Sequence, residues 1–269
     1  VLDENNIHKD SKYYYLTALS IRCTAKRMYP DYISAKKMRE NYEGNVFSPM
    51  GCRAFLSPWQ DEHGNYKFDG RFNMGVVTIN LPQIGILAEG NEEKFFHILE
   101  KRLELCKKVC MLRYELLQRA NSDSSPIHWQ HGAIARLGKH ESIQELLING
   151  YATVTLGYIG VYEATLLTKG VSHTDPKGTE FALKVMKKLN EKVNEWKAET
   201  GLGFALYGTP AESLTHRFNS IDRKRFGVIK DVTDKGYYIN SFHVDVRENI
   251  DVFSKFEFEA QFQDLSRGG

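Results

Sequence analysis

Apolar and polar residues follow a helical period over the longest regular segment of the chain, residues 91–120. Leu99, Leu103, Cys106 and Cys110 stand four, three and four positions apart, which places them on one face of a helix. The segment opens with an asparagine as N-cap and two glutamates, whose charge suits the first turn. Related patterns predict further helices at residues 34–41, 141–149, 176–200 and 210–219.

Short apolar runs lie between these helices and are predicted to form strands. The runs are residues 76–81, 152–159 and 204–207, and Pro82 ends the first of them. Residues 10–29 are rich in tyrosine, leucine and isoleucine and are expected to be buried, whereas the tail at 237–263 mixes strand-like and acidic segments. Long helices alternating with short apolar strands are typical of an α/β fold with parallel strands.

The composition is that of a globular chain. Its 269 residues can bury the core of one large domain or two small ones, and 42% apolar with 26% charged residues is ordinary. A net charge of +2 gives no reason to expect a nucleic-acid or membrane partner. No apolar run has membrane-spanning length or resembles a signal peptide. Because the chain starts at Val1 without methionine, we expect a piece of a longer protein.

The spacing of the cysteines argues against a zinc site or a disulfide framework. No C-x-x-C pair occurs among Cys23, Cys52, Cys106 and Cys110, so we predict no metal site and expect a reducing, cytoplasmic compartment. Cys106 and Cys110 are predicted to be core residues. The histidines of the segment His128-Trp129-Gln130-His131 are interpreted as surface or polar-core residues.

One cysteine stands in a segment typical of a loop tip, Ser48-Pro49-Met50-Gly51-Cys52-Arg53. Apolar residues on both sides indicate that this loop points into protein. A free cysteine is most often a small buried hydrophobe, but a single thiol held by its own loop also suits radical or covalent sulfur chemistry. Asn73 follows 21 positions later, in a turn that feeds the first predicted strand.

A second candidate site is the segment Thr209-Pro210-Ala211-Glu212-Ser213. Its pattern is that of a capping box, with Thr209 at the N-cap, Pro210 at the first helical position and Glu212 at the third. Free N–H groups at such a helix start, together with the Thr209 and Ser213 hydroxyls, can bind an anion.

These segments closely resemble the anaerobic (class III) ribonucleoside-triphosphate reductases, a branch of the glycyl radical enzymes. The cysteine segment, the strand segment Gly70–Pro82 and the threonine turn occur in the family's order. The similarity also includes Gly157-Tyr158-Ile159-Gly160-Val161-Tyr162-Glu163, Phe258-Glu259-Ala260 and the closing Gly268-Gly269.

The resemblance implies a fold and a set of site residues. The fold is expected to be part of a ten-stranded α/β barrel, made of two antiparallel half-barrels of parallel strands with a central cysteine finger loop. Residues 1–269 would be the later portion of that catalytic barrel domain. The resemblance makes Cys52 the thiyl radical that removes the 3′ hydrogen of the substrate ribose, and places Asn73 beside the sugar.

The resemblance also makes the threonine turn the site of the substrate phosphates. Its phosphate-binding residues would be Thr209, Ala211, Glu212 and Ser213, with Glu212 as a structural cap because its charge would repel a phosphate directly. Glu163 resembles a family position near the site, and Arg71 could contact an anion or support another side chain.

The implied parent is an oxidoreductase that converts ribonucleoside triphosphates to 2′-deoxyribonucleoside triphosphates with formate as reductant. It would be a homodimer with a structural zinc outside this chain, and its glycyl radical would be installed by an iron–sulfur, S-adenosylmethionine-dependent activase. The N-terminal part and the C-terminal zinc and glycyl radical region are absent from these residues, and Gly268-Gly269 lacks the context of the radical glycine. This piece is therefore expected to hold no cofactor and to be inactive alone. Another glycyl radical enzyme, of the lyase or acyltransferase type, and a non-catalytic nucleotide-binding module with the same fold remain alternatives.

Overall fold

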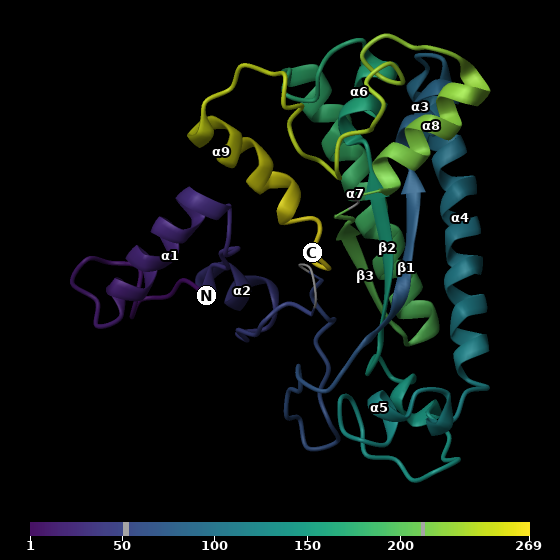
Figure 1. The fold of residues 1–269 in the computed structure, drawn as a ribbon. Helices are drawn as coiled ribbons and strands as arrows, with labels where there is room; N and C mark the ends of the chain where they lie inside the picture. Colours follow the sequence, from purple (N-terminus) through teal and green to yellow (C-terminus); the bar gives the residue numbers. More distant parts are fainter. Residues whose placement is uncertain (51–53, 211–212) are drawn as a thin grey trace. The chain divides into compact units, whose positions relative to one another are not determined.

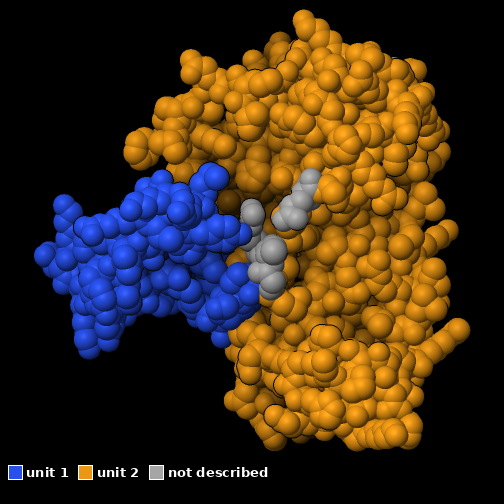
Figure 2. Space-filling model, in the orientation of Figure 1, with its two compact units in different colours: residues 1–49 blue, residues 50–269 orange. Residues whose placement is uncertain are grey.

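The computed structural model describes residues 1–50, 54–210 and 213–269 (Figure 1), and the chain divides into two compact units (Figure 2). Unit 1, residues 1–49, contains α1 (Tyr14–Arg27) and α2 (Ala35–Asn41). The prediction of a helix at 34–41 is confirmed, because Ser34 caps α2 by accepting the Lys37 N–H. The prediction that residues 10–29 are buried is wrong. Apolar side chains stand all around α1, so no single packing face could cover them, and Thr17 is its buried residue.

Unit 2 is an α/β unit built on a parallel sheet. The sheet order is β1-β2-β3, and Figure 1 shows the three arrows pointing the same way. The α/β prediction with parallel strands is therefore confirmed for the described residues. The elements of unit 2 are β1 (Asn73–Asn80), α3 (Leu81–Ala88), α4 (Glu92–Leu117), α5 (Pro126–Trp129), β2 (Thr153–Ile159), α6 (Val161–Lys169), α7 (Pro176–Thr200), β3 (Gly203–Gly208), α8 (Leu214–Phe226) and α9 (Val252–Gln263), with 3₁₀ turns at Ser122–Ser124 and Gln144–Leu146.

The two faces of β2 differ in chemistry. Val154, Leu156 and Tyr158 are fully buried in the core that helices α3, α4, α6 and α7 form on one side of the sheet. Successive side chains of a strand point to opposite faces, so Thr153, Thr155 and Gly157 belong to the other face. That face is also covered, since Thr153 and Thr155 are buried and the Thr153 hydroxyl oxygen accepts the Ser57 N–H at 3.2 Å. The sheet therefore carries hydroxyl groups on a buried face.

The long helices follow the sequence prediction. Asn91 caps α4 by accepting the Lys94 N–H at 2.9 Å, and Leu99, Leu103 and Cys110 are fully buried. Burial raises the pKa of Cys110 to about 12, so this thiol stays protonated and acts as a core residue. The helix predicted at 176–200 is α7, with the predicted bounds.

One sequence prediction in unit 2 is incomplete and two are wrong. Pro82 does more than end a strand, because it stands in the first turn of α3, where its missing N–H costs nothing. The predicted helix at 141–149 is a single 3₁₀ turn, since the Glu141 carbonyl accepts the Ser122 N–H instead of a helical partner. The tail contains a regular helix, α9, rather than strand-like segments.

Arg71 is buried and satisfies backbone carbonyls. Its guanidinium donates to the carbonyls of Tyr151 at 2.7 Å, Lys67 at 2.9 Å and Gly150 at 2.9 Å. Burial lowers the pKa of Arg71 to about 10, which leaves it charged at neutral pH. Arg71 therefore ties the start of β1 to the segment before β2, a structural use of the residue.

We expect Arg71→Lys to lower the free energy of unfolding by about 2 kcal/mol, because an ammonium cannot reach three carbonyls held by a planar fork. Chemical denaturation measures this change. Arg119→Lys is the matched control, since Arg119 is exposed, and it should change stability little. Equal stability of the two variants would contradict the role given to Arg71.

Candidate functional site

Two threonine hydroxyls from the outer strands meet above the central strand. Thr78 Oγ1 of β1 and Thr209 Oγ1, one residue past β3, are 3.1 Å apart. The strands that flank β2 are about 10 Å from each other, so their side chains meet only if the residue between them is small. Gly157 of β2 meets this need, because a Cβ there would lie 2.1 Å from Thr209 Oγ1 and 2.6 Å from Thr78 Oγ1. The absence of a side chain at Gly157 thus allows the two threonine hydroxyls to meet.

Asn73 lies at the start of β1 on the same face of the sheet. A register shift separates Asn73 from Val76, and Gly75 within it has φ +131°. The Gly75 N–H donates to Asn73 Oδ1 at 2.8 Å, which turns the amide nitrogen towards Thr155, whose hydroxyl oxygen accepts its N–H. The amide of Asn73 is therefore oriented by two contacts and is half-buried.

The capping box predicted at Thr209 is wrong. Helix α8 begins at Leu214 with Ser213 as its N-cap residue, and Thr209 and Pro210 lie outside any helix. The Thr209 hydroxyl is instead paired with that of Thr78 in β1. Ser213 is exposed at the start of α8. Ala211 and Glu212 lie outside the described residues.

Cys52 also lies outside the described residues, as do its two neighbours. The residues on either side of this gap pair with each other as an antiparallel bridge, and the Met50 N–H donates to the Ala54 carbonyl at 2.7 Å. After the bridge, the Phe55 N–H donates to the Gly268 carbonyl at 2.9 Å. The Ser57 hydroxyl donates to the Phe204 carbonyl at 3.2 Å. These contacts join the segment after the gap to β3 and to the end of the chain.

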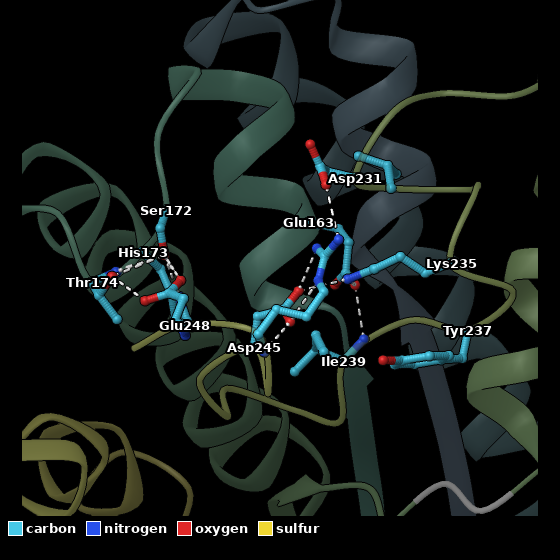
Figure 3. Close-up of polar contacts among 12 residues, drawn as sticks. Glu163, Ser172, His173, Thr174, Asp231, Lys235, Tyr237, Ile239, Asp245 and Glu248 are labelled. Carbon is cyan, nitrogen blue, oxygen red and sulfur yellow. Dashed lines mark hydrogen bonds and ion pairs between the residues drawn. The ribbon is translucent and has the colours of Figure 1, made fainter. Parts of the chain in front are cut away.

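A buried ion cluster lies where β2 passes into α6 (Figure 3). Lys235 Nζ is 2.8 Å from Glu163 Oε1 and 3.0 Å from Asp245 Oδ2, and these three side chains are at most 5% exposed. The Arg247 guanidinium makes two further bonds to Asp245, at 2.8 Å and 3.0 Å, and reaches Asp231 at 2.9 Å. The cluster joins α6 to the irregular segment 227–251, which connects α8 to α9.

The two carboxyl groups in contact with Lys235 are perturbed in opposite directions. Burial raises the pKa of Glu163, although Lys235 opposes the change, and its Oε2 has no hydrogen-bond partner among the described residues. Burial also disfavours charge on Asp245, but hydrogen bonds from Arg247 and Lys235 outweigh it and hold the pKa of Asp245 well below its usual range. Asp245 is thus the firmly charged member of the pair.

Other polar side chains hold the same segment at further points. Ser172 and Thr174, between α6 and α7, donate to the two carboxylate oxygens of Glu248 (Figure 3). Buried His173 donates from Nε2 to the Phe242 carbonyl at 2.9 Å, and burial lowers the pKa of this histidine. Tyr238 donates to the buried carboxylate of Asp222 at 3.0 Å. These polar contacts hold the segment alongside the apolar packing of Val232, Tyr238 and Phe242.

Comparison with known proteins identifies the family. The family model for anaerobic ribonucleoside-triphosphate reductase matches residues 1–269. The chain belongs to this family. Over 270 residues it is 42% identical to the anaerobic ribonucleoside-triphosphate reductase of Enterobacteria phage T4. This match covers 98% of this chain and 43% of the phage protein. The reductase of Escherichia coli K12 is 38% identical, over 100% of this chain and 38% of its own length. The chain thus spans about two-fifths of the length of these curated relatives.

Solved structures support the fold of this chain. The anaerobic ribonucleotide reductase of Thermotoga maritima with citrate in the active site matches with a TM-score of 0.59 and 22% identity, over 80% of this chain and 37% of that chain. The same enzyme in complex with dATP and CTP gives a TM-score of 0.59 at 21% identity, over 80% and 34% of the two chains. The shared feature is the α/β fold with its parallel sheet.

The structure brings together some of the predicted site residues of this reductase chain and adds others. Asn73 and Thr209 lie on one face of the sheet, and Thr78, Thr155 and Gly157 join them there, although no sequence motif singled out the two threonines. The signal available in the sequence was the placement of these polar and small residues at alternate positions of β1 and β2, which puts them on one face of the sheet. Across the described residues, no group of three or more histidine, cysteine, aspartate or glutamate side chains is placed to hold a metal ion. No described helix has the length and apolar character needed to cross a membrane.

Gly157→Ala should lower the free energy of unfolding by about 1–3 kcal/mol, because the new methyl group must push the two hydroxyls apart. In a Thr209→Ala background the nearest atom is gone, so the cost of the same change should fall. A double-mutant cycle by denaturation measures this coupling. An identical cost in both backgrounds would show that Thr209 does not lie over Gly157.

Asp245→Asn should lower the free energy of unfolding at pH 7 by about 3 kcal/mol, because two cations lose their shared partner. The depressed pKa of Asp245 means that its stabilisation is present above the unfolded pKa of about 3.9 and is lost as the pH falls towards the folded value. Between pH 5 and pH 2 the unaltered protein should therefore lose more stability than the variant. Asp231→Asn is the control, since Asp231 is 41% exposed and touches only one member of the cluster, Arg247. Parallel pH profiles for Asp245→Asn and the unaltered protein would contradict this assignment.

Proposed function

We propose that this chain carries the radical cysteine and the substrate-facing strands of an anaerobic reductase that converts ribonucleoside triphosphates to 2′-deoxyribonucleoside triphosphates. Membership of the reductase family over residues 1–269 supports the reaction class. The observation that carries the proposal is the oriented amide of Asn73 on a buried polar face, beside Thr155 and on the same face as the Thr78–Thr209 pair. A ribose with several hydroxyls needs such a surface.

In the proposed chemistry, Cys52 acts as a thiyl radical. The thiyl takes a hydrogen atom from C3′ of the ribose, so that an S–H bond forms, a C–H bond breaks and the unpaired electron moves to C3′. The two bonds are close in strength, which makes the step reversible. Water must be excluded while the radical exists, and the apolar residues on both sides of the cysteine segment suit that need.

Asn73 is proposed to hold the ribose hydroxyls. An amide can both donate and accept hydrogen bonds, but it does not readily act as a general base. Because the Gly75 N–H fixes which end of the amide is which, Asn73 would present a defined donor to the sugar. A neutral group at this place fits a mechanism in which formate, rather than a pair of protein thiols, supplies the reducing equivalents.

The turn between β3 and α8 is proposed to bind the substrate phosphates. Its members are Thr209, Ala211, Glu212 and Ser213, of which Glu212 would shape the turn rather than touch the anion. The start of α8, a helix of 13 residues, offers free N–H groups and the positive end of its dipole. Thr209 is presented to the ligand by its partner Thr78.

The whole protein is proposed to follow the family pattern. The chain would be the later portion of a ten-stranded barrel domain, in a cytoplasmic homodimer, with a structural zinc and a glycyl radical region elsewhere in the protein. The glycyl radical, installed by the iron–sulfur activase, supplies the oxidising equivalent that creates the thiyl. A lyase or acyltransferase is disfavoured, because the family model that matches the whole chain is that of the reductases.

Cys52→Ala in the full-length parent should abolish deoxyribonucleotide formation, because the variant lacks the thiol proposed to take the hydrogen from C3′. The glycyl radical should still form, as seen by electron paramagnetic resonance. Cys106→Ala is the control: that thiol is half-buried in the core, and the change should leave turnover in place. Measurable deoxyribonucleotide production by Cys52→Ala would overturn the proposed function. The proposed function would also fail if the unaltered parent, carrying its radical, bound nucleotides but formed no deoxyribonucleotide.

A further inference from the structure

Ser241 has a left-handed backbone conformation although it is not a glycine. Its φ is +41°, and the residue is 3% exposed. Residues with a Cβ seldom adopt this region, and they remain there only where their surroundings fix it. The surroundings of Ser241 are therefore informative.

Neighbouring elements fix the backbone around Ser241 residue by residue. The end of β2 pairs with this segment through an antiparallel bridge between Ile159 and Asn240. Glu163 of the ion cluster and the buried His173 each make one of the hydrogen bonds that hold this backbone. The bonds are Ile239 N–H to Glu163 Oε1 at 2.9 Å, Gly160 N–H to the Ile239 carbonyl at 3.0 Å, Val161 N–H to the Ser241 carbonyl at 3.0 Å, and His173 Nε2 to the Phe242 carbonyl at 2.9 Å.

This fixed serine lies beside Gly208, the last residue of β3, whose N–H donates to the Gly269 carbonyl at 2.7 Å. A Cβ built on Gly208 would lie 3.2 Å from Ser241 Cβ and 3.4 Å from its Oγ. By the alternation of side chains along a strand, Gly208 faces away from the side on which Tyr207 and Thr209 point. Thr78 thus contacts the chain at Thr209 on one face, and Ser241 occupies the space next to Gly208 on the other.

We propose that Ser241 is a positioning residue for the substrate phosphates. Its Cβ supports Gly208 and so fixes the direction in which Thr209 leaves β3. The effect passes through Gly208 and Thr209, because Ser241 lies on the side of the strand opposite the hydroxyl pair. Lys235 contributes by the same route, since it holds Glu163, which receives the Ile239 N–H. This inference rests on the proposed function, in which the Thr209 turn binds the phosphates.

Ser241→Gly in the full-length parent tests the proposal. Glycine adopts φ +41° without strain, so the fold should be as stable as before or more stable. The support behind Gly208 is lost, however, and a misplaced turn should bind a ribonucleoside triphosphate about tenfold more weakly. Binding of the corresponding ribonucleoside should not change. Ser241→Ala keeps the Cβ and should keep triphosphate binding.

Asn149→Gly is the matched control, because Asn149 also has a positive φ of 54° but is exposed and lies before β2, at the other end of the sheet. Calorimetric titration of each variant with ribonucleoside and ribonucleoside triphosphate gives the comparison. Unchanged triphosphate affinity in Ser241→Gly would overturn the proposal, as would an equal loss in Ser241→Ala, which would assign the effect to the hydroxyl. If the unaltered parent binds triphosphate no better than nucleoside, the proposed function of the turn fails instead, and this proposal fails with it.

Discussion

The ammonium group of Lys235, buried between two carboxylates, fixes the part of the fold that surrounds the strand ends. Glu163 stands in the first turn of α6, whereas Lys235 and Asp245 both lie in the irregular segment 227–251, so one side chain joins this segment to α6 and also bridges two of its own turns. Charges removed from water cost several kcal/mol each unless they are paired. The segment cannot move away from α6 without exposing or unpairing them. A bridge of this kind orders a long segment that has little regular structure of its own.

The polar face of the sheet depends on a different constraint, the absence of a side chain at Gly157. Parallel strands hold their neighbours at a fixed spacing, so groups on β1 and β3 meet only across a gap in β2. Thr78 and Thr209 use that gap. At the other end of β1, the register shift at Gly75 also positions a polar group, because the Gly75 N–H orients the amide of Asn73. Two glycines therefore determine where the polar atoms lie, while the helix-covered face supplies the apolar packing.

Helical periodicity predicted α4 and α7, and short apolar runs predicted the three strands, because these patterns act over a few residues at a time. The pattern Thr209-Pro210-Ala211-Glu212 suggested a helix start, but the pairing of Thr209 with Thr78, 131 positions away, prevailed over the local signal. The contact of Lys235 with Glu163 spans 72 positions and leaves no local trace. The roles of Cys52 and Asn73 came from resemblance to the reductase family, and spacing alone would have left Cys52 as an ordinary core thiol.

The use of buried charge in addition to apolar packing around the strand ends has a consequence for the proposed chemistry. A well-packed apolar cluster can match an ion cluster in stability, but ion pairs and hydrogen bonds impose direction on each partner. Direction is what holds Ser241 in a left-handed conformation against Gly208. Reactions that depend on hydrogen-atom transfer tolerate little misplacement of the substrate. A segment tied by directional contacts can therefore support a binding turn more rigidly than one held by apolar contacts of equal stability.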